Sequence, residues 1–407
     1  MGVAAGQLAS SSVNTLDSQT PLLPSKNEVF DVVVVGAGVF GSWIALNFVR
    51  SGARVALVDS YGPANSRASS GDESRVIRAG YGPDELYSRW AMRSLTLWKE
   101  FSASSGKTVF RQTGVLRIAG DDPFSKATEE VLRRLQVKFE KLDRPQLEKR
   151  FPQFAFCAGE WGLLEPDAGA LLARQAVLAV FDEAVHLGVR YVGASAIEPL
   201  GSGPLNQVDL KNGSSLKAGT FIFACGSWLG KLFPEILGHR IFPTRQEVFY
   251  FGVPEGNGQF CSPNMPTWIC GPDEIYGIPV LDDNRGIKIA SDQHGPQADP
   301  DIMERAVCAE SIQNMRAYLG KRFPRLANAP ISETRVCQYE NTSNGDFLVD
   351  QHPHLKNVWM VGGGSGHGFK HGPAMGEYVF QRIASNAPAE PRFSLATKQT
   401  VQKREVH

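Results

Sequence analysis

The chain has 407 residues, enough for two or three domains with a sizeable hydrophobic core. Its 42 basic and 42 acidic residues cancel, so its charge favours neither a nucleic acid nor an anionic membrane as a partner. The longest apolar run is far shorter than a membrane span, and we therefore expect no membrane segment.

We predict a tail at each end of the chain. Residues 1–27 lack the basic start and apolar stretch of a signal peptide, and residues 389–407 end without a recognised targeting sequence. The cysteines are scattered with no metal-like spacing, so we expect thiols in a reducing compartment and no metal site. These features favour a cytoplasmic location.

A glycine-rich turn joins the first predicted strand to the first predicted helix. Residues 31–35 are mostly β-branched, and residues 39–50 have the apolar period of a helix. Gly36 permits a tight turn, Gly38 allows a diphosphate to approach the backbone, and Gly41 lets the helix pack closely on the strand. The helix N-terminus would offer free N–H groups to phosphate oxygens.

A second predicted strand, residues 54–58, ends at Asp59. This acid follows Gly41 by eighteen residues, where a carboxylate can bind the ribose hydroxyls of an adenine dinucleotide. Strand, turn, helix and acid together predict dinucleotide binding, and the alternative is a glycine turn with only a structural role.

The loop at residues 62–82 is rich in glycine and serine and contains Arg67, Arg75 and Arg78. Small residues allow a loop to wrap a dinucleotide, and arginine can bind phosphate or carboxylate in a bidentate way. The alternative is a solvated surface loop with incidental arginines.

Further elements follow in chain order. Apolar periodicity predicts helices at residues 86–101 and 171–187, strands at 114–118 and 189–196, and a charged helical stretch at 123–150. We expect the strand at 189–196 to return to the nucleotide-binding sheet. A hairpin is predicted at 201–213, with its turn at Asn212 and Gly213.

The later part of the chain contains two kinds of strand. Residues 221–228 read as a buried strand that enters the first sheet. Residues 248–251, 275–278 and 286–290 are aromatic and β-branched, and they predict a mainly antiparallel second domain that forms the floor of a substrate pocket.

A third glycine feature lies near the end. Residues 358–361 predict a strand, residues 362–368 a glycine loop, and Pro373 the start of a helix that runs to Arg382. A nicotinamide enzyme rarely needs such a return to the cofactor, whereas a flavin does, because loop N–H groups and a helix N-terminus can stabilise the negative charge of the reduced ring. The alternative is a flexible glycine loop.

The chain resembles the monomeric sarcosine oxidase group of flavin-dependent amine oxidases, in the D-amino-acid oxidase-like superfamily, and is similar to pipecolate and fructosyl amino acid oxidases. The resemblance covers residues 28–387 and is carried by VVVVGAGVFGSWIA, GDESRVIRAGYG, FACGSW, RVCQYENTSNGDFLVD and VGGGSGHGFKHGP. It implies FAD as cofactor and oxidation of a secondary or N-substituted amino acid by O2 to an imine, with release of hydrogen peroxide.

The resemblance also implies an α/β fold, α+β overall, with a Rossmann-like FAD-binding domain and a mainly antiparallel β substrate domain. We expect the FAD-binding domain at 28–110, 168–237 and 334–388, and the substrate domain at 111–167 and 238–333. Nothing in the sequence requires an oligomer, and we expect a monomer.

The family attaches its flavin through a cysteine in a Cys-x-Tyr-x-x-Thr pattern, which Cys337, Tyr339 and Thr342 match. Asn344 stands where the family has an aspartate. The resemblance therefore implies covalent attachment at Cys337, although composition alone would make any of the cysteines a core thiol.

Further residues take their roles from the resemblance. Arg78 and Lys370 match the pair that grips the substrate carboxylate, and Arg75 matches a residue beside the flavin ring. Tyr276 matches a pocket tyrosine, and Lys288 matches the lysine that promotes O2 reduction. Without the family, a packing or surface role would be preferred for each Tyr or Lys.

The predicted cofactor-binding residues combine the motifs with the resemblance, and no metal ligands are expected. They are Gly36, Gly38, Val39, Phe40, Gly41, Asp59, Ser60, Arg67, Ser70, Arg75, Gly226, Trp228, Cys337, Gly364, Gly366, His367, Gly368 and Lys370.

One position departs from the family. Four residues after its oxygen-site lysine the sarcosine enzyme has a pocket histidine, whereas this chain has Asp292 there and His294 two residues later. Either the register slips and the chemistry is unchanged, or the pocket has an extra negative charge that favours a cationic or polyhydroxylated substrate.

Three hypotheses compete. The first is an oxidase of a secondary amino acid or a sugar-derived Amadori adduct, and the second is a flavin dehydrogenase or demethylase that passes electrons to a carrier. The third is a flavoprotein-like binding subunit, against which Cys337, Arg78 and Lys370 argue. A fourth possibility, a nicotinamide dehydrogenase without flavin, would require the purified protein to be colourless.

Overall fold

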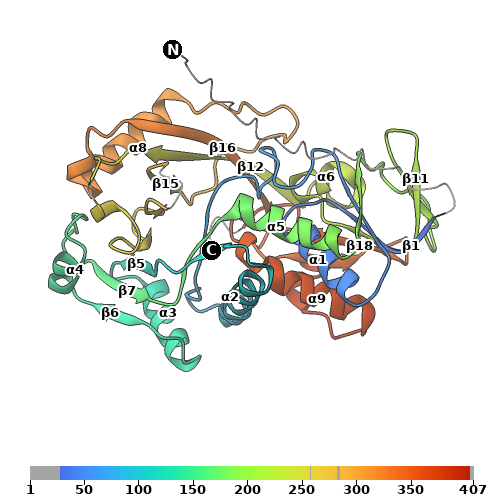
Figure 1. Cartoon of the computed structure of the whole chain (residues 1–407), viewed down its shortest axis with the longest axis horizontal. Coiled ribbons are helices and arrows are strands. Elements are labelled where there is room, and N and C mark those ends of the chain that lie inside the picture. The colour runs from blue at the N-terminus through green and yellow to red at the C-terminus, as the bar shows by residue number, and fades with distance from the viewer. Residues whose placement is uncertain (1–27, 257, 282–284, 404–407) are drawn as a thin grey trace, which may run out of the picture.

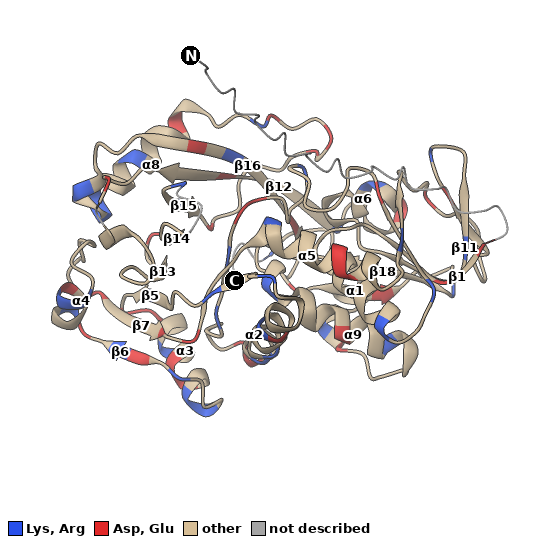
Figure 2. Ribbon diagram, in the orientation of Figure 1, with Lys and Arg blue, Asp and Glu red and all other residues tan. Residues whose placement is uncertain are grey.

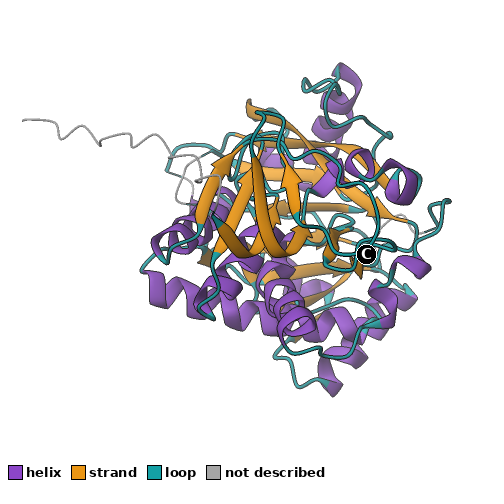
Figure 3. Cartoon of the chain, turned by 90° about the vertical axis from the view of Figure 1, so that its right-hand side faces the viewer, coloured by secondary structure: helices purple, strands orange, loops and turns teal. Residues whose placement is uncertain are grey.

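A computed structural model describes residues 28–256, 258–281 and 285–403. The predicted amino-terminal tail and residues 404–407 lie outside the described residues. Strands fill the middle of the molecule and helices lie against their outer sides (Figures 1 and 3). Within the described ranges, every helix is too short or too polar to cross a membrane.

The first sheet is mainly parallel and is built around β1 (Val29–Val35). It has seven strands, ordered β17-β18-β11-β1-β2-β9 with β10 beside β11. Antiparallel β17 forms one edge of the sheet, and antiparallel β10 pairs with the start of β11. The strands other than β1 are β2 (Val55–Asp59), β9 (Arg190–Gly193), β10 (Gln207–Asp209), β11 (Ser215–Phe223), β17 (Leu348–Gln351) and β18 (Val358–Gly362).

The predicted returns to this sheet are confirmed. β9 pairs with β2, and β11 pairs with β1, both in parallel. The predicted hairpin is also present, because β10 pairs with β11 in antiparallel across the Asn212-Gly213 turn.

The two faces of β1 are buried in different cores, as expected when side chains alternate along a strand. Val32 and Val34 pack into a cluster with the helices of one face, while Val33 and Val35 pack into the cluster on the other face. The first face is covered by α1 (Val39–Arg50), α2 (Glu85–Ser105), α5 (Ala173–His186) and α9 (Gly372–Ala384). The other face meets α6 (Leu229–Leu232) and α7 (Pro234–Leu237).

The second sheet is mainly antiparallel, as predicted, and has eight strands in the order β16-β12-β15-β14-β13-β5-β7-β6. Among the strand pairs that the structure describes in this sheet, only β13–β5 is parallel. Its strands are β5 (Val115–Ala119), β6 (Glu140–Leu142), β7 (Trp161–Glu165), β12 (Ile241–Phe251), β13 (Thr267–Cys270), β14 (Ile275–Ile278), β15 (Ile287–Ser291) and β16 (Ile331–Thr342).

Helices α4 (Arg144–Arg150) and α8 (Ala309–Arg322) pack Leu147 and Leu319 into the core of the second sheet, and α3 (Pro123–Arg134) lies beside α2. A third sheet of three strands connects these parts: β3 (Arg75–Ile77), β8 (Gly169–Leu171) and β4 (Phe110–Arg111).

Charged residues of both signs intermix on the outer helices (Figure 2). On α2 and α3, for example, Glu85 pairs with both Arg89 and Arg134, and Arg133 pairs with Glu129. Such exposed pairs contribute little stability each, but they keep the surface free of a single-sign patch on these helices.

Three details differ from the sequence predictions. The stretch 123–150 is two helices separated by β6, because an edge strand interrupts it. The expected boundary at residue 334 falls inside β16, which belongs to the second sheet. Residues 389–403 do not form a free tail, since Phe393 is buried in the first core and Lys398 is buried too. The division into two domains itself stays a prediction.

Candidate active site

A cavity of about 470 Å³ lies where β1 and β2 end and α1 begins. Gly36 has φ +108°, and a Cβ there would meet the carbonyl oxygen of Ala224 at 2.3 Å. A Cβ at Gly41 would meet the oxygen of Gly36 at 1.8 Å, so Gly41 serves close packing, as predicted. A Cβ at Gly38 would meet only Ser70 Oγ, at 3.6 Å, and this position therefore opens onto the cavity.

The start of α1 suits an anion. Gly38 is the N-cap and, as a glycine, has no side chain of its own to cap the helix. Ser70 Oγ accepts a hydrogen bond from the N–H of Val39 at 3.2 Å, which joins the arginine-rich loop to the helix N-terminus. Backbone N–H groups and the helix dipole can thus face a diphosphate.

Asp59 closes the glycine turn from the end of β2. Its carboxylate accepts hydrogen bonds from the N–H groups of Ala37, at 2.7 Å, and Tyr61, at 2.8 Å. Burial raises the pKa of Asp59, which the backbone N–H groups oppose. The carboxylate lines the cavity, where a ribose hydroxyl can reach it.

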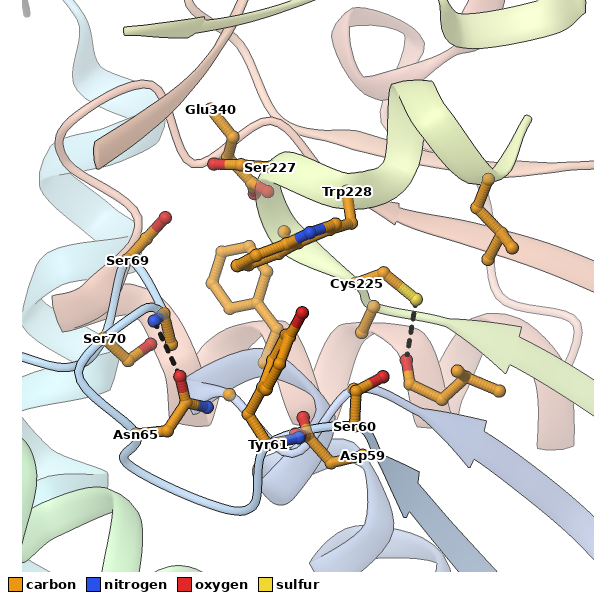
Figure 4. Close-up of a pocket in the computed structure, with 18 of the residues that line it drawn as sticks. Asp59, Ser60, Tyr61, Asn65, Ser69, Ser70, Cys225, Ser227, Trp228 and Glu340 are labelled. Carbon is orange, nitrogen blue, oxygen red and sulfur yellow. Dashed lines mark hydrogen bonds between the residues drawn. The ribbon is translucent and has the colours of Figure 1, made fainter. Parts of the chain in front are cut away.

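Two aromatic rings stand together in this cavity. Figure 4 shows Tyr61 and Trp228 near one another, with ring centroids 5.8 Å apart. Trp228 Nε1 donates to Asp301 at 2.7 Å, which fixes the indole. The pair offers flat apolar surfaces to an adenine or a similar ring.

A second cavity of about 70 Å³ adjoins the first. Both are lined by Arg75, Tyr339, Gly366 and Phe369, so the two cavities share a wall. The smaller one also contains Arg78, Tyr276, Cys337, His367 and Lys370. The structure thus brings together residues from the arginine loop, β14, β16 and the last glycine loop.

Arg78 and Lys370 form the cationic end of the smaller cavity. Arg78 is 7% exposed, and its Nη1 has no hydrogen-bond partner among the described residues. Lys370 Nζ donates to Tyr81 Oη at 2.8 Å and to the carbonyl of His367 at 3.1 Å. Burial and the nearby Arg78 hold the pKa of Lys370 well below its usual range. A buried guanidinium with an open donor is suited to a carboxylate.

Asp292 and His294 both line the smaller cavity. The position that departs from the family therefore adds an acidic side chain to the cavity wall. Tyr339 Oη donates to Asp292 at 3.4 Å. Burial raises the pKa of Asp292, and the charges of Arg78 and Lys370 offset only part of this rise. The cavity therefore has an acidic group facing its two cations.

Arg75 connects the two cavities at Cys337. Its Nη2 lies 3.5 Å from Cys337 Sγ and donates to the carbonyl of Ser69 at 2.7 Å, and its Nη1 donates to Asp72 at 2.8 Å. Cys337 is 7% exposed and lines the smaller cavity. Arg75 thus fixes a positive charge beside the predicted attachment point.

Lys288 is placed differently from the other predicted residues. It is 1% exposed, pairs with Asp72 and donates to the carbonyl of Ser74 at 2.8 Å, and it lines neither cavity. Tyr250 Oη also donates to Asp72, at 3.0 Å. Against the raising effect of burial, Lys288 and Arg75 hold the pKa of Asp72 below its usual range. Lys288 Nζ lies 5.7 Å from the centroid of the Tyr276 ring, behind the wall of the smaller cavity.

Most predicted cofactor-binding residues line the larger cavity, but five do not. Gly41 packs under the turn, and Arg67 is exposed and stacks on Tyr61. The other three, Cys337, His367 and Lys370, line the smaller cavity. Lining residues that the sequence did not indicate include Tyr61, Ala194, Lys231, Asp301, Gln338 and Glu340. Of these, the aromatic Tyr61, which follows the motif acid Asp59 by two residues, is the one that its local sequence could have indicated.

The donor set fits a flavin dinucleotide. The open Gly38 position, the N-terminus of α1 and Asp59 suit an adenine dinucleotide, and the wall shared at Arg75 and Tyr339 would set a redox ring next to the smaller cavity, which Arg78 and Lys370 line. Residues 31–382 match the family model described as FAD dependent oxidoreductase. The chain belongs to this family.

Curated relatives agree over almost the whole chain. The monomeric sarcosine oxidase of Bacillus sp. (strain B-0618) is 29% identical over 389 residues, which cover 92% of this chain and 98% of that protein. The peroxisomal sarcosine oxidase of Homo sapiens is 28% identical, with 90% of this chain and 95% of that protein covered.

The fold agrees with a solved structure. The fructosyl amine: oxygen oxidoreductase (amadoriase I) of Aspergillus fumigatus superposes with a TM-score of 0.76 at 20% identity, covering 92% of this chain and 91% of that one.

Proposed function

We propose that this FAD-dependent oxidoreductase is an oxidase of a secondary or N-substituted amino acid. The amino acid would become an imine and O2 would become hydrogen peroxide. The imine would hydrolyse to an amine and an aldehyde or keto product. The observation that carries the proposal is the open Nη1 of buried Arg78, beside Lys370, in a cavity that shares a wall with the dinucleotide cavity.

Arg78 and Lys370 would bind the α-carboxylate of the substrate and so orient its amine. A desolvated cavity with two cations lowers the pKa of a bound amine, which favours the neutral form whose lone pair drives imine formation. FAD, when bound, supplies a two-electron acceptor for the carbon–hydrogen bond next to nitrogen.

Two finer assignments belong to the proposal. Cys337 would be the covalent attachment point of the flavin, which its place in the wall beside Arg75 supports. Lys288 would assist O2 reduction by its positive charge. Because Asp72 and the Tyr276 ring surround it, Lys288 would act from behind the cavity wall.

The domain division and the setting are also part of the proposal. The two large sheets support an FAD-binding and a substrate domain, with β16 assigned to the second. All six cysteines are free thiols, which supports a reducing compartment such as the cytoplasm. We propose a monomer, in keeping with the name of the Bacillus relative.

Asp292 favours a second candidate, an oxidase of sugar-derived Amadori adducts. A carboxylate in the substrate cavity can accept hydrogen bonds from several hydroxyls, and the Aspergillus neighbour is a fructosyl amine oxidoreductase. A dehydrogenase that passes electrons to a carrier remains the alternative for the oxidative half of the reaction.

Peroxide release in air tests the proposal. We expect peroxide with sarcosine, another N-methyl amino acid, pipecolate or a fructosyl amino acid, and none with the same amine lacking its carboxylate. Arg78→Lys should lower kcat/KM about a hundredfold, because it removes the bidentate fork. The control is Arg93→Lys, which alters an exposed arginine paired with Glu377 and should leave kcat/KM unchanged. Equal rates with and without the carboxylate would refute the proposal.

A further inference from the structure

The second half of β16 divides its side chains between the two cavities. Cys337 lies in the wall of the smaller cavity, whereas Gln338 and Glu340 lie in the wall of the larger one, and Tyr339 reaches both. This follows from the alternation of side chains along a strand. The strand that bears the predicted flavin attachment point thus also turns two polar side chains toward the dinucleotide cavity.

Both side chains are buried with hydrogen-bonding atoms left over. Gln338 is 1% exposed and Glu340 is 6% exposed. Within the part of the chain that the structure describes, neither the Nε2 nor the Oε1 atom of Gln338 has a partner, and neither does Glu340 Oε2. Buried polar groups in proteins are nearly always satisfied, so unmatched atoms in a cavity wall point to a polar ligand.

Only one of the two carboxyl oxygens of Glu340, Oε1, has a hydrogen-bond partner among the described residues. Its Oε1 accepts the N–H of Gly364 at 3.0 Å, and the backbone of Ser365 donates to its carbonyl oxygen at 3.0 Å. A Cβ at Gly226 would lie 3.2 Å from Oε2, so that glycine leaves room beside the free oxygen. Figure 4 shows Glu340 beside Ser227 in the cavity.

The carboxyl has no neutralising cation. Among the described residues no ion pair involves Glu340, and its charge, after burial and together with that of Asp59, raises the pKa of the nearby Cys225 thiol. Burial raises the pKa of Glu340 to about 7, which the N–H groups of Gly364 and Gly363 oppose. A cavity that takes a diphosphate adds further negative charge, and a neutral carboxyl is then both donor and acceptor.

We propose that Gln338 and Glu340 are cofactor-binding residues whose side chains hydrogen-bond the hydroxyl-bearing ribityl chain of FAD. That chain joins the diphosphate, for which the α1 N-terminus is suited, to the ring, for which the wall at Cys337 is suited. An amide and a neutral carboxyl each offer a donor and an acceptor, as the hydroxyls of a polyol require. The inference rests on FAD binding and not on the amine substrate.

Equilibrium binding of FAD tests the inference. The proteins carry Cys337→Ser so that the cofactor is held without a covalent bond, and the FAD dissociation constant is followed by quenching of flavin fluorescence. We expect Glu340→Leu and Gln338→Leu each to weaken FAD binding about tenfold or more. Glu340→Gln keeps an acceptor for Gly364 and a donor toward the ligand, and it should stay within about twofold.

The matched control is Glu165→Gln. Glu165 is equally buried and accepts the N–H groups of Ala79 and Gly80, but it lines neither cavity. The FAD affinity of the Glu165→Gln variant should equal that of the Cys337→Ser parent. Thermal unfolding confirms that each variant is folded before its affinity is compared.

A deoxy-ribityl analogue of FAD separates the ribityl chain from other parts of the cofactor. The analogue should bind less tightly than FAD to the parent, and the difference should shrink in Glu340→Leu or Gln338→Leu. Unchanged affinity in both folded Leu variants overturns the proposal. If Glu340→Gln loses as much FAD affinity as Glu340→Leu, the neutral carboxyl is not a hydrogen-bond donor to FAD. If the difference in affinity between FAD and the analogue is as large in both Leu variants as in the parent, these side chains do not bind the ribityl chain.

Discussion

Lys370 Nζ lies 2.8 Å from the hydroxyl oxygen of Tyr81, and both residues are buried. Tyr81 also meets His371 Nε2 at 2.8 Å, and its ring lies under Arg78, 4.7 Å from centroid to Cζ. Tyr81 lines neither cavity. It therefore positions both cations of the proposed carboxylate site from behind.

Tyr81→Phe keeps the ring under Arg78 and removes the hydroxyl that holds Lys370. We expect KM for the amino acid to rise about tenfold, since a hydrogen bond to a charged group contributes about 1.5–3 kcal/mol. The visible spectrum of the flavin should not change. Steady-state kinetics measure the effect, with Tyr318→Phe, a buried tyrosine of the second core, as the control. A KM within twofold of wild type would contradict a positioning role.

Cys337→Ser tests the covalent attachment. Wild-type protein should keep yellow, fluorescent flavin on a denaturing gel, and Cys337→Ser should release it. Cys225→Ser is the matched control, because Cys225 lines the larger cavity but donates its thiol to the carbonyl of Val35 at 3.5 Å. Burial also raises the pKa of Cys225, which makes it a poor nucleophile. Fluorescence lost from Cys225→Ser but kept by Cys337→Ser would reverse the assignment.

Asp292→Asn tests whether the acid in the substrate cavity selects the substrate. Removing the charge should lower kcat/KM for a fructosyl or cationic amino acid at least tenfold. The kcat/KM for sarcosine should stay the same or rise, because Asp292 no longer competes with the substrate carboxylate for Arg78 and Lys370. The ratio of kcat/KM for the two substrates is the measurement. Equal losses for both would show that Asp292 serves the site generally and does not choose between substrates.

Glu340 gives a pH-dependent stability. Its pKa in the fold is raised to about 7, so the folded state holds the proton more tightly than the unfolded chain does. Its stabilising contribution is present below the unfolded pKa, near 4.5, and is lost as the pH rises to about 7. Relative to Glu340→Gln, wild type should lose about 3 kcal/mol of unfolding free energy across this window. Denaturant unfolding at several pH values measures it, and parallel curves would contradict the shift.

Local patterns predicted the elements that hold the dinucleotide. Gly36, Gly38 and Asp59 lie within one strand-turn-helix-strand unit, so their spacing alone fixes their geometry. The resemblance added Arg78, Cys337 and Lys370, and the structure brings these distant residues to one cavity.

Other features depend on long-range pairing that no local pattern records. Lys288 meets Asp72 from 216 residues away, which removes it from the cavity wall. The face of β16 that carries Gln338 and Glu340 is set by its register with β12. Residues 389–403 read as a tail because they form only short turns, yet Arg392 pairs with Asp84 and Asp346 and Phe393 fills the first core.

Anaerobic mixing of the purified protein with amino acids tests the central claim most directly. The visible flavin band should bleach with at least one of sarcosine, an N-methyl amino acid, pipecolate or a fructosyl amino acid, and air should restore it. The same amine without its carboxylate should leave the band unchanged, because Arg78 and Lys370 then have no anion to bind. A full flavin band that none of these amino acids bleaches would contradict both the carboxylate site and the amine oxidase.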